Sequence, residues 1–585
     1  MARSPTAVTR RVPGTPVGGG APAELRASGL WDPVRRGTAF LIAAGVFLAV
    51  LALSLAFPNP TPQTDEYYHL LVSRSLEAGR GLRITPEAAP YDRAWLFSLS
   101  VYASQQLFGA TLGAARIPGA LAWAATAGLV AWTLSRRGGL VAALIAAGAL
   151  GLAVHTLMFS SMVRFYTPQA LFVLLAALTL DRTLREWKRG RRGRAAGWLT
   201  AASVAAALGL LMQPTTLVPA FAASIWCGLV GLVAWWGWPV RRRAVSAGVT
   251  AAVVGLAAAG MWFGGLPGYI DSVTSDTAVW AESNADNTTF YTDRLGLWYR
   301  PFWLLLPLWA AAAVLRGGPS AAARRRGLAF FLVMGLVPLL VHSLVPTKAF
   351  RYLLYAVPFL FGAAALGMAE ALRGVALLVL AGVRTLGSGV GLGRPAARAA
   401  GVAAAALAVL LVVGYGFFWR SPGIARGVQM LAGDLSGSPF QRSDWAAASA
   451  VLRPRVERAG VVIASAGNKS LWFFGRLDLT LSVALDVDKD PDWLQPQDGR
   501  PVITEPEELA AARAAHATGL VIVEDEHWRT PAFVTDAAAD WLEASCRPID
   551  LPPGCRLRAF AWGPDPEGDP AEAGAAGGAA GGGGR

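Results

Sequence analysis

The chain has 585 residues, of which 54% are hydrophobic and 15% are charged, and its formal net charge is +14. Its mean hydropathy of +0.43 and its low charged fraction exclude an ordinary soluble protein, in which about a quarter of the residues are charged. The basic residues cluster in short loops between apolar runs, a pattern that orients membrane proteins. We therefore expect no nucleic-acid partner, and a polytopic membrane protein surrounded by lipid.

Apolar runs long enough to cross a bilayer recur from residue 38 onward and predict about eleven transmembrane helices. The Arg- and Pro-rich residues 1–36 precede them and are expected to form a disordered cytoplasmic N-terminus, with no cleavable signal peptide evident. The expected spans are 38–57, 113–134, 138–157, 168–184, 195–212, 217–238, 245–264, 300–315, 327–345, 352–372 and 400–419.

Residues 94–109 are also apolar, but the run is short and contains three serines and two glutamines. These properties are typical of an interfacial helix. Counting the run as a span would also place most basic loops on the wrong face of the membrane. We therefore interpret 58–112 as one large external loop of a transmembrane domain that covers residues 37–420.

The chain changes character after residue 420, where stretches typical of helices alternate with stretches typical of strands. The pattern predicts a periplasmic α/β domain over 421–563 with a partly parallel sheet, followed by a disordered Gly/Ala tail over 564–585. The expected helices are 444–458, 505–517 and 532–544, and the expected strands are 460–465 and 519–524. Cys546 and Cys555 are close enough in sequence to pair if this domain lies outside the cytoplasm.

Two adjacent carboxylates, Asp65 and Glu66, follow the first span by a few residues. Charge beside the hydrocarbon region is costly and is often functional, although a solvated loop or a helix N-terminus would explain it equally well. Tyr68 and His69 follow directly and are candidate substrate-binding residues.

Four cations share this external side, where the orientation rule leaves few: Arg116, Arg164, Lys348 and Arg351. Each alone has a structural explanation, such as snorkelling or helix capping. Together they predict a cavity that binds a phosphate, with a carboxylate opposite that accepts a proton from an attacking hydroxyl. Tyr166 and Tyr352, adjacent to the cations, are further candidates for substrate binding.

The stretches 65–68, 107–109, 115–119, 164–168 and 348–354 resemble the GT-C glycosyltransferases, in particular the protein O-mannosyltransferase and lipid A aminoarabinose-transferase type (family 39-like). The resemblance covers residues 38–370 and implies a GT-C fold with a periplasmic active site in the cell envelope. It also implies transfer of a hexose or pentose from a polyprenyl-phosphate donor to a glycolipid, glycan or protein. It assigns Asp65 as the catalytic base with Glu66 as its neighbour, and Lys348 and Arg351 to the donor phosphate. The chain departs from the family in lacking the acid of the Arg-x-x-x-Asp pattern after Arg164 and the Pro-Pro-Leu motif of the juxtamembrane helix.

Other interpretations stay open at this point. A transporter or flippase of an anionic lipid-linked solute would place charge near the bilayer midplane, whereas here it lies at the ends of the spans. A non-catalytic anchor for the C-terminal domain leaves the external cations unexplained. A divalent metal bound by Asp65, Glu66 and His69 is undecided, and the acids of the loop 265–299 (Asp271, Asp276, Glu282, Asp286 and Asp293) suit sugar binding or a solvated loop.

Overall fold

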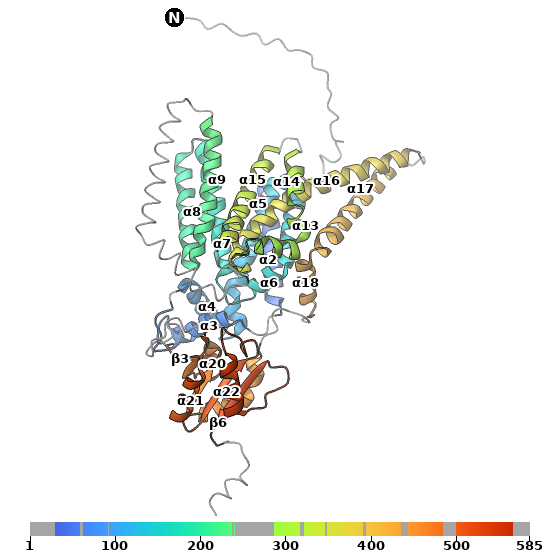
Figure 1. The fold of residues 1–585 in the computed structure, drawn as a ribbon. Coiled ribbons are helices and arrows are strands. Elements are labelled where there is room, and N and C mark those ends of the chain that lie inside the picture. Colours follow the sequence, from blue (N-terminus) through green and yellow to red (C-terminus); the bar gives the residue numbers. More distant parts are fainter. Residues whose placement is uncertain are drawn as a thin grey trace, which may run out of the picture.

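The structure is a computed structural model that describes residues 30–58, 62–91, 93–236, 239, 283, 286–315, 321–345, 348–389, 394–434, 443–483 and 499–564. A helix bundle forms one part and an α/β domain the other, and the helices α3 and α4 lie between the two (Figure 1). The expected span 245–264 and three acids of the loop 265–299, Asp271, Asp276 and Glu282, lie outside the described residues.

Seven helices in the described part are long and apolar enough to cross a membrane. The expected span at 168–184 is the helix α7, which is less apolar, and the expected span at 300–315 is divided between two short helices, so the count of eleven stays a prediction. The bundle consists of α2 (Arg36–Ala56), α5 (Leu112–Leu152), α6 (Val154–Ser160), α7 (Tyr166–Lys188), α8 (Arg192–Met212), α9 (Leu217–Trp236), α13 (Arg300–Trp303), α14 (Leu306–Leu315), α15 (Ala321–Leu344), η3 (Phe350–Ala356), α16 (Val357–Gly389), α17 (Arg394–Leu411) and η4 (Val412–Trp419).

The helix α5 is a hairpin of two legs rather than one long rod. Gly139 has a left-handed φ of 84°, and a Cβ there would lie 2.6 Å from the carbonyl oxygen of Leu30, so only glycine fits. Trp123 donates a hydrogen bond to the carbonyl of Leu150 at 3.1 Å. A straight helix would separate residues 27 positions apart by roughly 40 Å. The two legs therefore match the two spans expected at 113–134 and 138–157.

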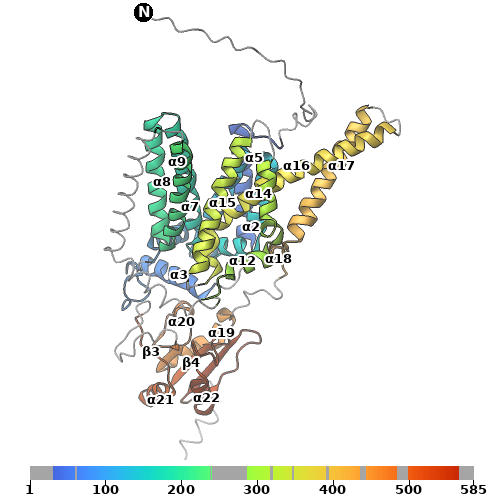
Figure 2. The same ribbon diagram turned by 45° about the horizontal axis from the view of Figure 1, so that its top comes forward.

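The helix α16 begins inside the bundle and continues outward, and α17 packs against it on the return, so the pair forms an arm that leans away from the other helices (Figure 2). The end of the bundle opposite the α/β domain is held by a buried carboxylate, Asp181, which pairs with Arg137 of α5 at 2.8 Å and Arg326 of α15 at 2.7 Å. A buried charge of this kind requires partners to offset its desolvation, and here it joins three helices.

The first loop forms two helices, α3 (Thr64–Glu77) and α4 (Trp95–Phe108), and α4 matches the interfacial helix expected at 94–109. The polar residues that argued against a span are bound to neighbours: Ser98 contacts His69 of α3, and Ser104 donates to the carbonyl of Ala114 at 2.6 Å. Gln105 accepts from Ser73 of α3 at 2.5 Å. These bonds attach α4 to α3 and to the start of α5.

The α/β domain contains a six-stranded sheet in the order β3-β2-β1-β4-β6-β5. The first four strands in this order are parallel and the last two antiparallel, as expected for a partly parallel sheet. The strands are β1 (Val461–Ala464), β2 (Leu479–Leu481), β3 (Val502–Ile503), β4 (Gly519–Glu524), β5 (Arg547–Pro548) and β6 (Leu557–Trp562). The helices are α18 (Pro422–Leu431), α19 (Trp445–Arg458), α20 (Gly467–Phe474), α21 (Pro506–Ala515) and α22 (Asp536–Ser545), of which α18 precedes the sheet domain.

Alternate residues of β1 face two different cores, as the period of a strand requires. Val461 and Ile463 pack with α21 and α22, whereas Val462 and Ala464 join a core that is continuous with that of the bundle. Cys546 belongs to the first core and Cys555 to the second, and both are free and buried. The two cysteines therefore lie on opposite faces of the sheet and do not form the disulfide considered from their spacing.

Candidate active site at the start of helix α3

The helix α3 begins with a capping box that uses one of the two candidate acids. Glu66 is fully buried, and its carboxylate accepts a hydrogen bond from the backbone N–H of Gln63 at 2.7 Å. It also accepts from the N–H of Val163 at 2.7 Å, in the turn between α6 and α7. Hydrogen bonds to a charged acceptor are stronger than neutral ones, so Glu66 fixes the start of α3 against that turn.

The same turn supplies the ion-pair partner of Asp65. The guanidinium of Arg164 lies 2.9 Å from Oδ2 of Asp65 and donates to the Asp65 carbonyl at 3.0 Å. It also donates to the hydroxyl of Tyr166 at 3.0 Å. The Arg164 side chain is 2% exposed, whereas that of Asp65 is 40% exposed. The cation is therefore held inside the protein, and the carboxylate remains accessible to a substrate.

Two further cations act on the carboxylate of Asp65. Burial alone would raise the pKa of Asp65, but the positive charges of Arg164, Arg351 and Arg93 outweigh it and hold the pKa below the usual value. Asp65 is therefore ionised at neutral pH. Arg351 is the second residue of η3, so the structure brings residues from positions 65, 164 and 351 to one place.

Sequence reasoning missed Arg93 and Tyr91. Arg93 is exposed, and its guanidinium lies 5.4 Å from the ring centroid of Phe165, the same ring that Arg164 approaches at 5.0 Å. The orientation rule that singled out Arg164 applies to Arg93 as well, but it applies equally to Arg74, Arg80 and Arg83 of this loop. Only the folded loop distinguishes them.

Aromatic rings line the site on the α3 side. Tyr68 stacks on Tyr91 with ring centroids 5.6 Å apart, and the fully buried His69 meets Tyr91, Phe97 and Phe165 edge to face. Nδ1 of His69 bonds the hydroxyl of Ser98 at 2.8 Å, and Nε2 is buried without a hydrogen-bond partner. Burial, followed by the charges of Arg164 and Arg93, holds the pKa of His69 well below its usual value, so the ring is neutral.

The remaining candidates have different surroundings. Lys348 is fully buried and donates to the carbonyls of Ser343 at 2.6 Å, His342 at 3.3 Å and Val345, so it caps the end of α15. It is not among the charged groups that act on Asp65, and a phosphate-binding role for Lys348 stays a prediction that these contacts do not support.

Tyr352 lies beneath the Arg351 guanidinium at 5.3 Å, and Tyr166 bonds Arg164, so both tyrosines border the cations of the site. Arg116 faces Glu66 rather than Asp65, and its Nε and Nη2 atoms are buried without hydrogen-bond partners. The described acids of the later loop, Asp286 and Asp293, are exposed.

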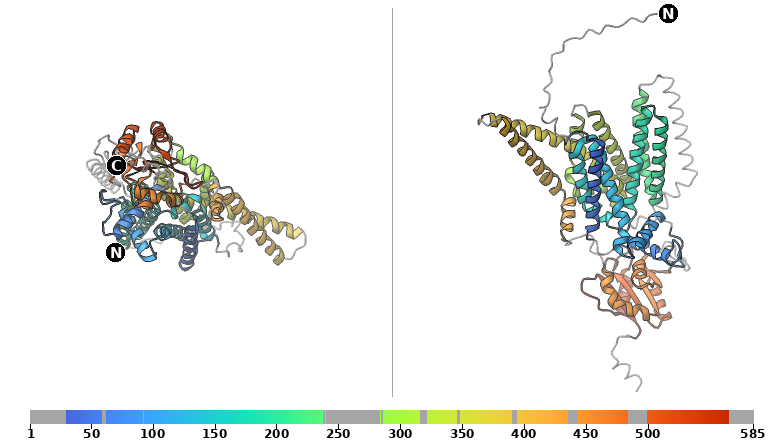
Figure 3. Two further views of the ribbon diagram at one scale, coloured as in Figure 1. Left: turned by 90° about the horizontal axis from the view of Figure 1, so that it is seen from below. Right: turned by 180° about the vertical axis from the view of Figure 1, so that it is seen from behind.

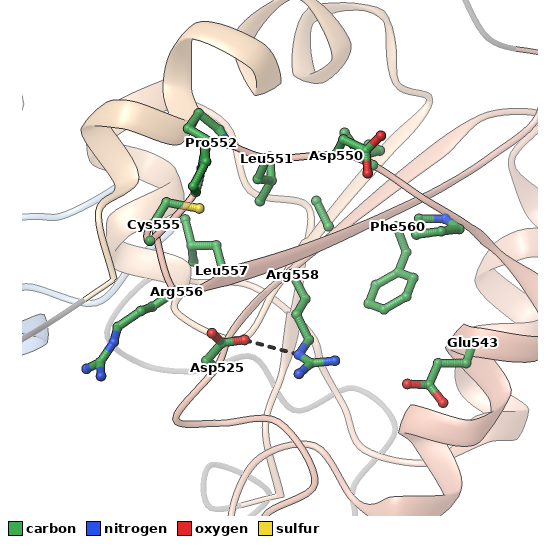
Figure 4. A pocket seen from close by; sticks show the side chains of 15 residues that line it. Asp525, Glu543, Asp550, Leu551, Pro552, Cys555, Arg556, Leu557, Arg558 and Phe560 are labelled. Atoms are coloured by element: carbon green, nitrogen blue, oxygen red, sulfur yellow. Dashed lines mark hydrogen bonds and ion pairs between the residues drawn. The ribbon is translucent and has the colours of Figure 1, made fainter.

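Within the described residues, Asp65, Glu66 and His69 do not form a close group of metal-ligand atoms; the group that does is Glu524, Glu526 and His527 of the α/β domain. Glu524 there is already paired with Lys469 at 2.6 and 2.8 Å. An open cavity of about 580 Å³ also lies in this domain, beside the loop that connects β5 to β6 (Figure 4). Its lining includes the exposed ion pair of Asp525 with Arg558 and none of the residues around Asp65, so it is separate from the candidate site.

Comparisons place this fold among known structures. No family model matches the chain, and no curated protein is similar to it in sequence. The structure is similar to ArnT from Cupriavidus metallidurans bound to undecaprenyl phosphate, with a TM-score of 0.51 and 13% identity over 90% of this chain and 98% of that one. It is also similar to the archaeal oligosaccharyltransferase AglB from Archaeoglobus fulgidus in complex with an inhibitory peptide and a dolichol-phosphate, with a TM-score of 0.52 and 12% identity over 83% of this chain and 69% of that one. The chain therefore has the GT-C fold of these two proteins, as expected, with an α/β domain at its C-terminal end.

Proposed function

We propose that this chain, with its GT-C fold, is a membrane glycosyltransferase that moves a sugar from a polyprenyl-phosphate donor to an acceptor hydroxyl of a glycolipid, glycan or protein. The observation that carries the proposal is the buried Arg164 that holds an accessible, ionised Asp65 within the field of Arg351 and Arg93. A carboxylate beside a set of cations suits the two halves of a glycosyl transfer, which need a base for the acceptor and positive charge for the departing phosphate. The undecaprenyl phosphate bound to the similar ArnT structure supports a lipid phosphate as the ligand.

Asp65 acts on the acceptor, and Arg351 and Arg93 act on the donor. The acceptor hydroxyl attacks the anomeric carbon of the sugar, the bond from that carbon to the phosphate oxygen breaks, and the bond electrons leave with the polyprenyl phosphate. Asp65 accepts the proton of the hydroxyl as the new bond forms. Arg351 and Arg93 bind the departing phosphate, since guanidinium groups match its oxygens in bidentate geometry.

Arg164 and Glu66 act through other residues. The ion pair and the two hydrogen bonds of Arg164 orient Asp65 and Tyr166, and the two backbone bonds of Glu66 place the helix that carries Asp65. We assign the site to the periplasmic side of a multi-pass inner membrane protein, with the N-terminus in the cytoplasm. The support is that Arg137, Arg189, Arg191 and Arg326 gather around Asp181 and Glu186, toward the other end of the bundle.

A transporter or flippase of an anionic lipid-linked solute is the second candidate, because it would also use cations that bind a phosphate. A transporter forms no glycosidic bond and needs no base for an acceptor hydroxyl, so normal product with a substituted Asp65 would favour it over the transferase.

The test compares surface glycolipids and glycoproteins by mass spectrometry in cells that carry the wild-type protein, Asp65→Asn, or no protein. We expect the product that is missing in the deletion strain to be missing with Asp65→Asn as well, while the amount of protein in the membrane is unchanged. Glu77→Gln, an exposed acid of the same helix, is the matched control and should restore the product. Normal product with Asp65→Asn would refute the transferase assignment and favour a transporter.

A further inference from the structure

The α/β domain contacts the bundle through the helix that carries Asp65. Tyr67 of α3 is fully buried, and its ring centroid lies 6.0 Å from that of Trp472 and 6.0 Å from that of Phe473, both in α20. Tyr67 follows Asp65 by two residues, which at about 100° per residue puts the two side chains on opposite sides of α3. The helix is therefore held between α20 on one side and Arg164 on the other.

Arg74 forms a second contact on the same face of α3, since it follows Tyr67 by seven residues, or about two turns. Its guanidinium carbon lies 3.3 Å from the ring centroid of Trp472, and its Nη1 donates to the Trp472 carbonyl at 2.9 Å. One arginine thus binds both the side chain and a carbonyl near the C-terminal end of α20, where helix carbonyls lack partners.

The helix α20 is itself fixed to the sheet. Lys469 pairs with Glu524 at the end of β4, and Glu524 also accepts from the indole of Trp445 at 2.7 Å. Near the other end of α20, Arg453 of α19 donates to the carbonyl of Phe473 at 2.6 Å. These bonds fix α20 to β4 and α19, so α3 packs against a helix that is attached to the core of the domain.

The domain also touches the first loop at a second point. Gly499 has a φ of 69°, and a Cβ there would lie 2.9 Å from the backbone nitrogen of Ala88, so the two chains approach closely. Arg500 pairs with Glu87 at 3.4 Å beside it. Both contacts involve the loop 58–112, which supplies Asp65 and Arg93 to the site. In Figure 3 the helices of this loop, in blue, lie next to the orange part of the α/β domain.

We propose that the α/β domain is a structural part of the active site, in which Trp472 of α20 is a positioning residue that holds α3 and so places Asp65 against Arg164. The inference rests on the proposed function where it concerns turnover. The placement of α3 itself is measurable whether or not the chain is a transferase.

The test uses the full-length protein in lipid nanodiscs and hydrogen–deuterium exchange of residues 64–77. Trp472→Ala removes the ring that Arg74 and Tyr67 contact, and Trp472→Phe restores a ring at the same position. Trp541→Ala is the matched control, because Trp541 is a similarly half-buried tryptophan in the core on the other face of the sheet. We expect faster exchange in α3 with Trp472→Ala, exchange near that of the wild type with Trp472→Phe, and no change in α3 with Trp541→Ala.

The same variants are then compared in cells by the amount of the product that Asp65→Asn abolishes, per amount of folded protein. Trp472→Ala should reduce it about tenfold or more, since small misplacement of a catalytic group has effects of this size, and Trp472→Phe should recover most of it. Unchanged exchange in α3, or a loss of product no greater than that with Trp541→Ala, would overturn the inference. A further outcome separates the two proposals. If Trp472→Ala speeds exchange in α3 but Asp65→Asn still forms product, the proposed function is wrong and the positioning role of Trp472 stands.

Discussion

At the scale of single residues, the two members of the ion pair at the site differ in burial: Arg164 is buried, and Asp65 is partly exposed. Arg164 is buried and makes two hydrogen bonds and one ion pair, which offset the cost of removing its charge from water. Asp65 is partly exposed and shares the field of two other cations. The pair therefore fixes the carboxylate and keeps it ionised while leaving one side of it accessible.

Arg164→Met should raise the pKa of Asp65, because it removes a positive charge that now lowers this pKa against the effect of burial. A carboxylate with a lowered pKa acts as a base only above that pKa, so the acid limb of product formation should move to higher pH. The measurement is the pH dependence of product formation in membrane vesicles that contain the native donor and acceptor. Arg80→Met, an exposed arginine of the same loop, is the control and should leave the limb in place, and an unmoved limb with Arg164→Met would count against the ion pair's role.

Some site residues were accessible to sequence reasoning and others were not. Asp65, Arg164 and Arg351 were identified because charges beside external span ends are rare, and the structure brings these three together. Lys348 met the same criterion but caps a helix end, since the sequence does not show where a side chain turns. Arg93 depends on how the loop folds back on Phe165, which no local pattern predicts.

At the scale of elements, the lengths of the apolar runs predicted the long helices, and the sequence predicted the strands β1 and β4 but not β6, which is as long as β4. The strand expected at 519–524 is β4, and the interfacial helix expected at 94–109 is α4. The strands β2, β3 and β5 form by pairing with a neighbouring strand: β2 with β1, β3 with β2, and β5 with β6. They have only two or three residues each, too few to show a period. The short helix α20 was missed for the same reason, although it forms the contact with α3.

We predict that the α/β domain is less stable in acid, because His527 and Glu524 at the carboxyl end of β4 have shifted pKa values. Burial lowers the pKa of His527 to about 4. Between pH 6.5 and 4 the unfolded chain therefore binds a proton that the folded domain does not bind. The stability of the domain decreases as the pH is lowered through this interval. At about 1.4 kcal/mol per pKa unit the loss is on the order of 3 kcal/mol. Burial alone would raise the pKa of Glu524, but the charge of Lys469 outweighs this effect and holds the pKa below its usual value. The domain therefore loses further stability in stronger acid, as Glu524 is protonated.

Hydrogen–deuterium exchange of β1 and β4 at pH values between 7 and 4, corrected for the intrinsic rates, measures this effect. His527→Gln should reduce the loss of protection over this interval, because glutamine does not titrate, whereas the exposed His516→Gln should not change it. Equal losses in the wild type and His527→Gln would exclude His527 as the source.

At the scale of the whole molecule, the two ends of the bundle differ in what covers them (Figure 1). The helices α3 and α4 and the α/β domain lie at one end, in blue and in orange to red in Figure 3. The ion pairs of Asp181 with Arg137 and Arg326 lie toward the other end. The lengths and charges of the apolar runs predicted this division, because both follow from the bilayer itself. They could not predict that the α/β domain rests on α3, since that contact depends on side chains far apart in sequence.

The orientation is tested with alkaline phosphatase fusions, which are active only outside the cytoplasm. A fusion after residue 564, at the end of the α/β domain, should be active, and a fusion at Gly190, in the turn between α7 and α8, should be inactive. The reverse pattern would place the candidate site in the cytoplasm and remove the basis for a periplasmic transferase.

The central claim is that a lipid phosphate binds beside Asp65, and the most direct test is an electron cryomicroscopy structure of the full chain in nanodiscs with undecaprenyl phosphate. We predict phosphate density within hydrogen-bonding distance of the guanidinium groups of Arg351 and Arg93, on the exposed side of Asp65. Phosphate density at the Asp181 end of the bundle, or at a position from which neither arginine nor Asp65 can be reached, would contradict the account.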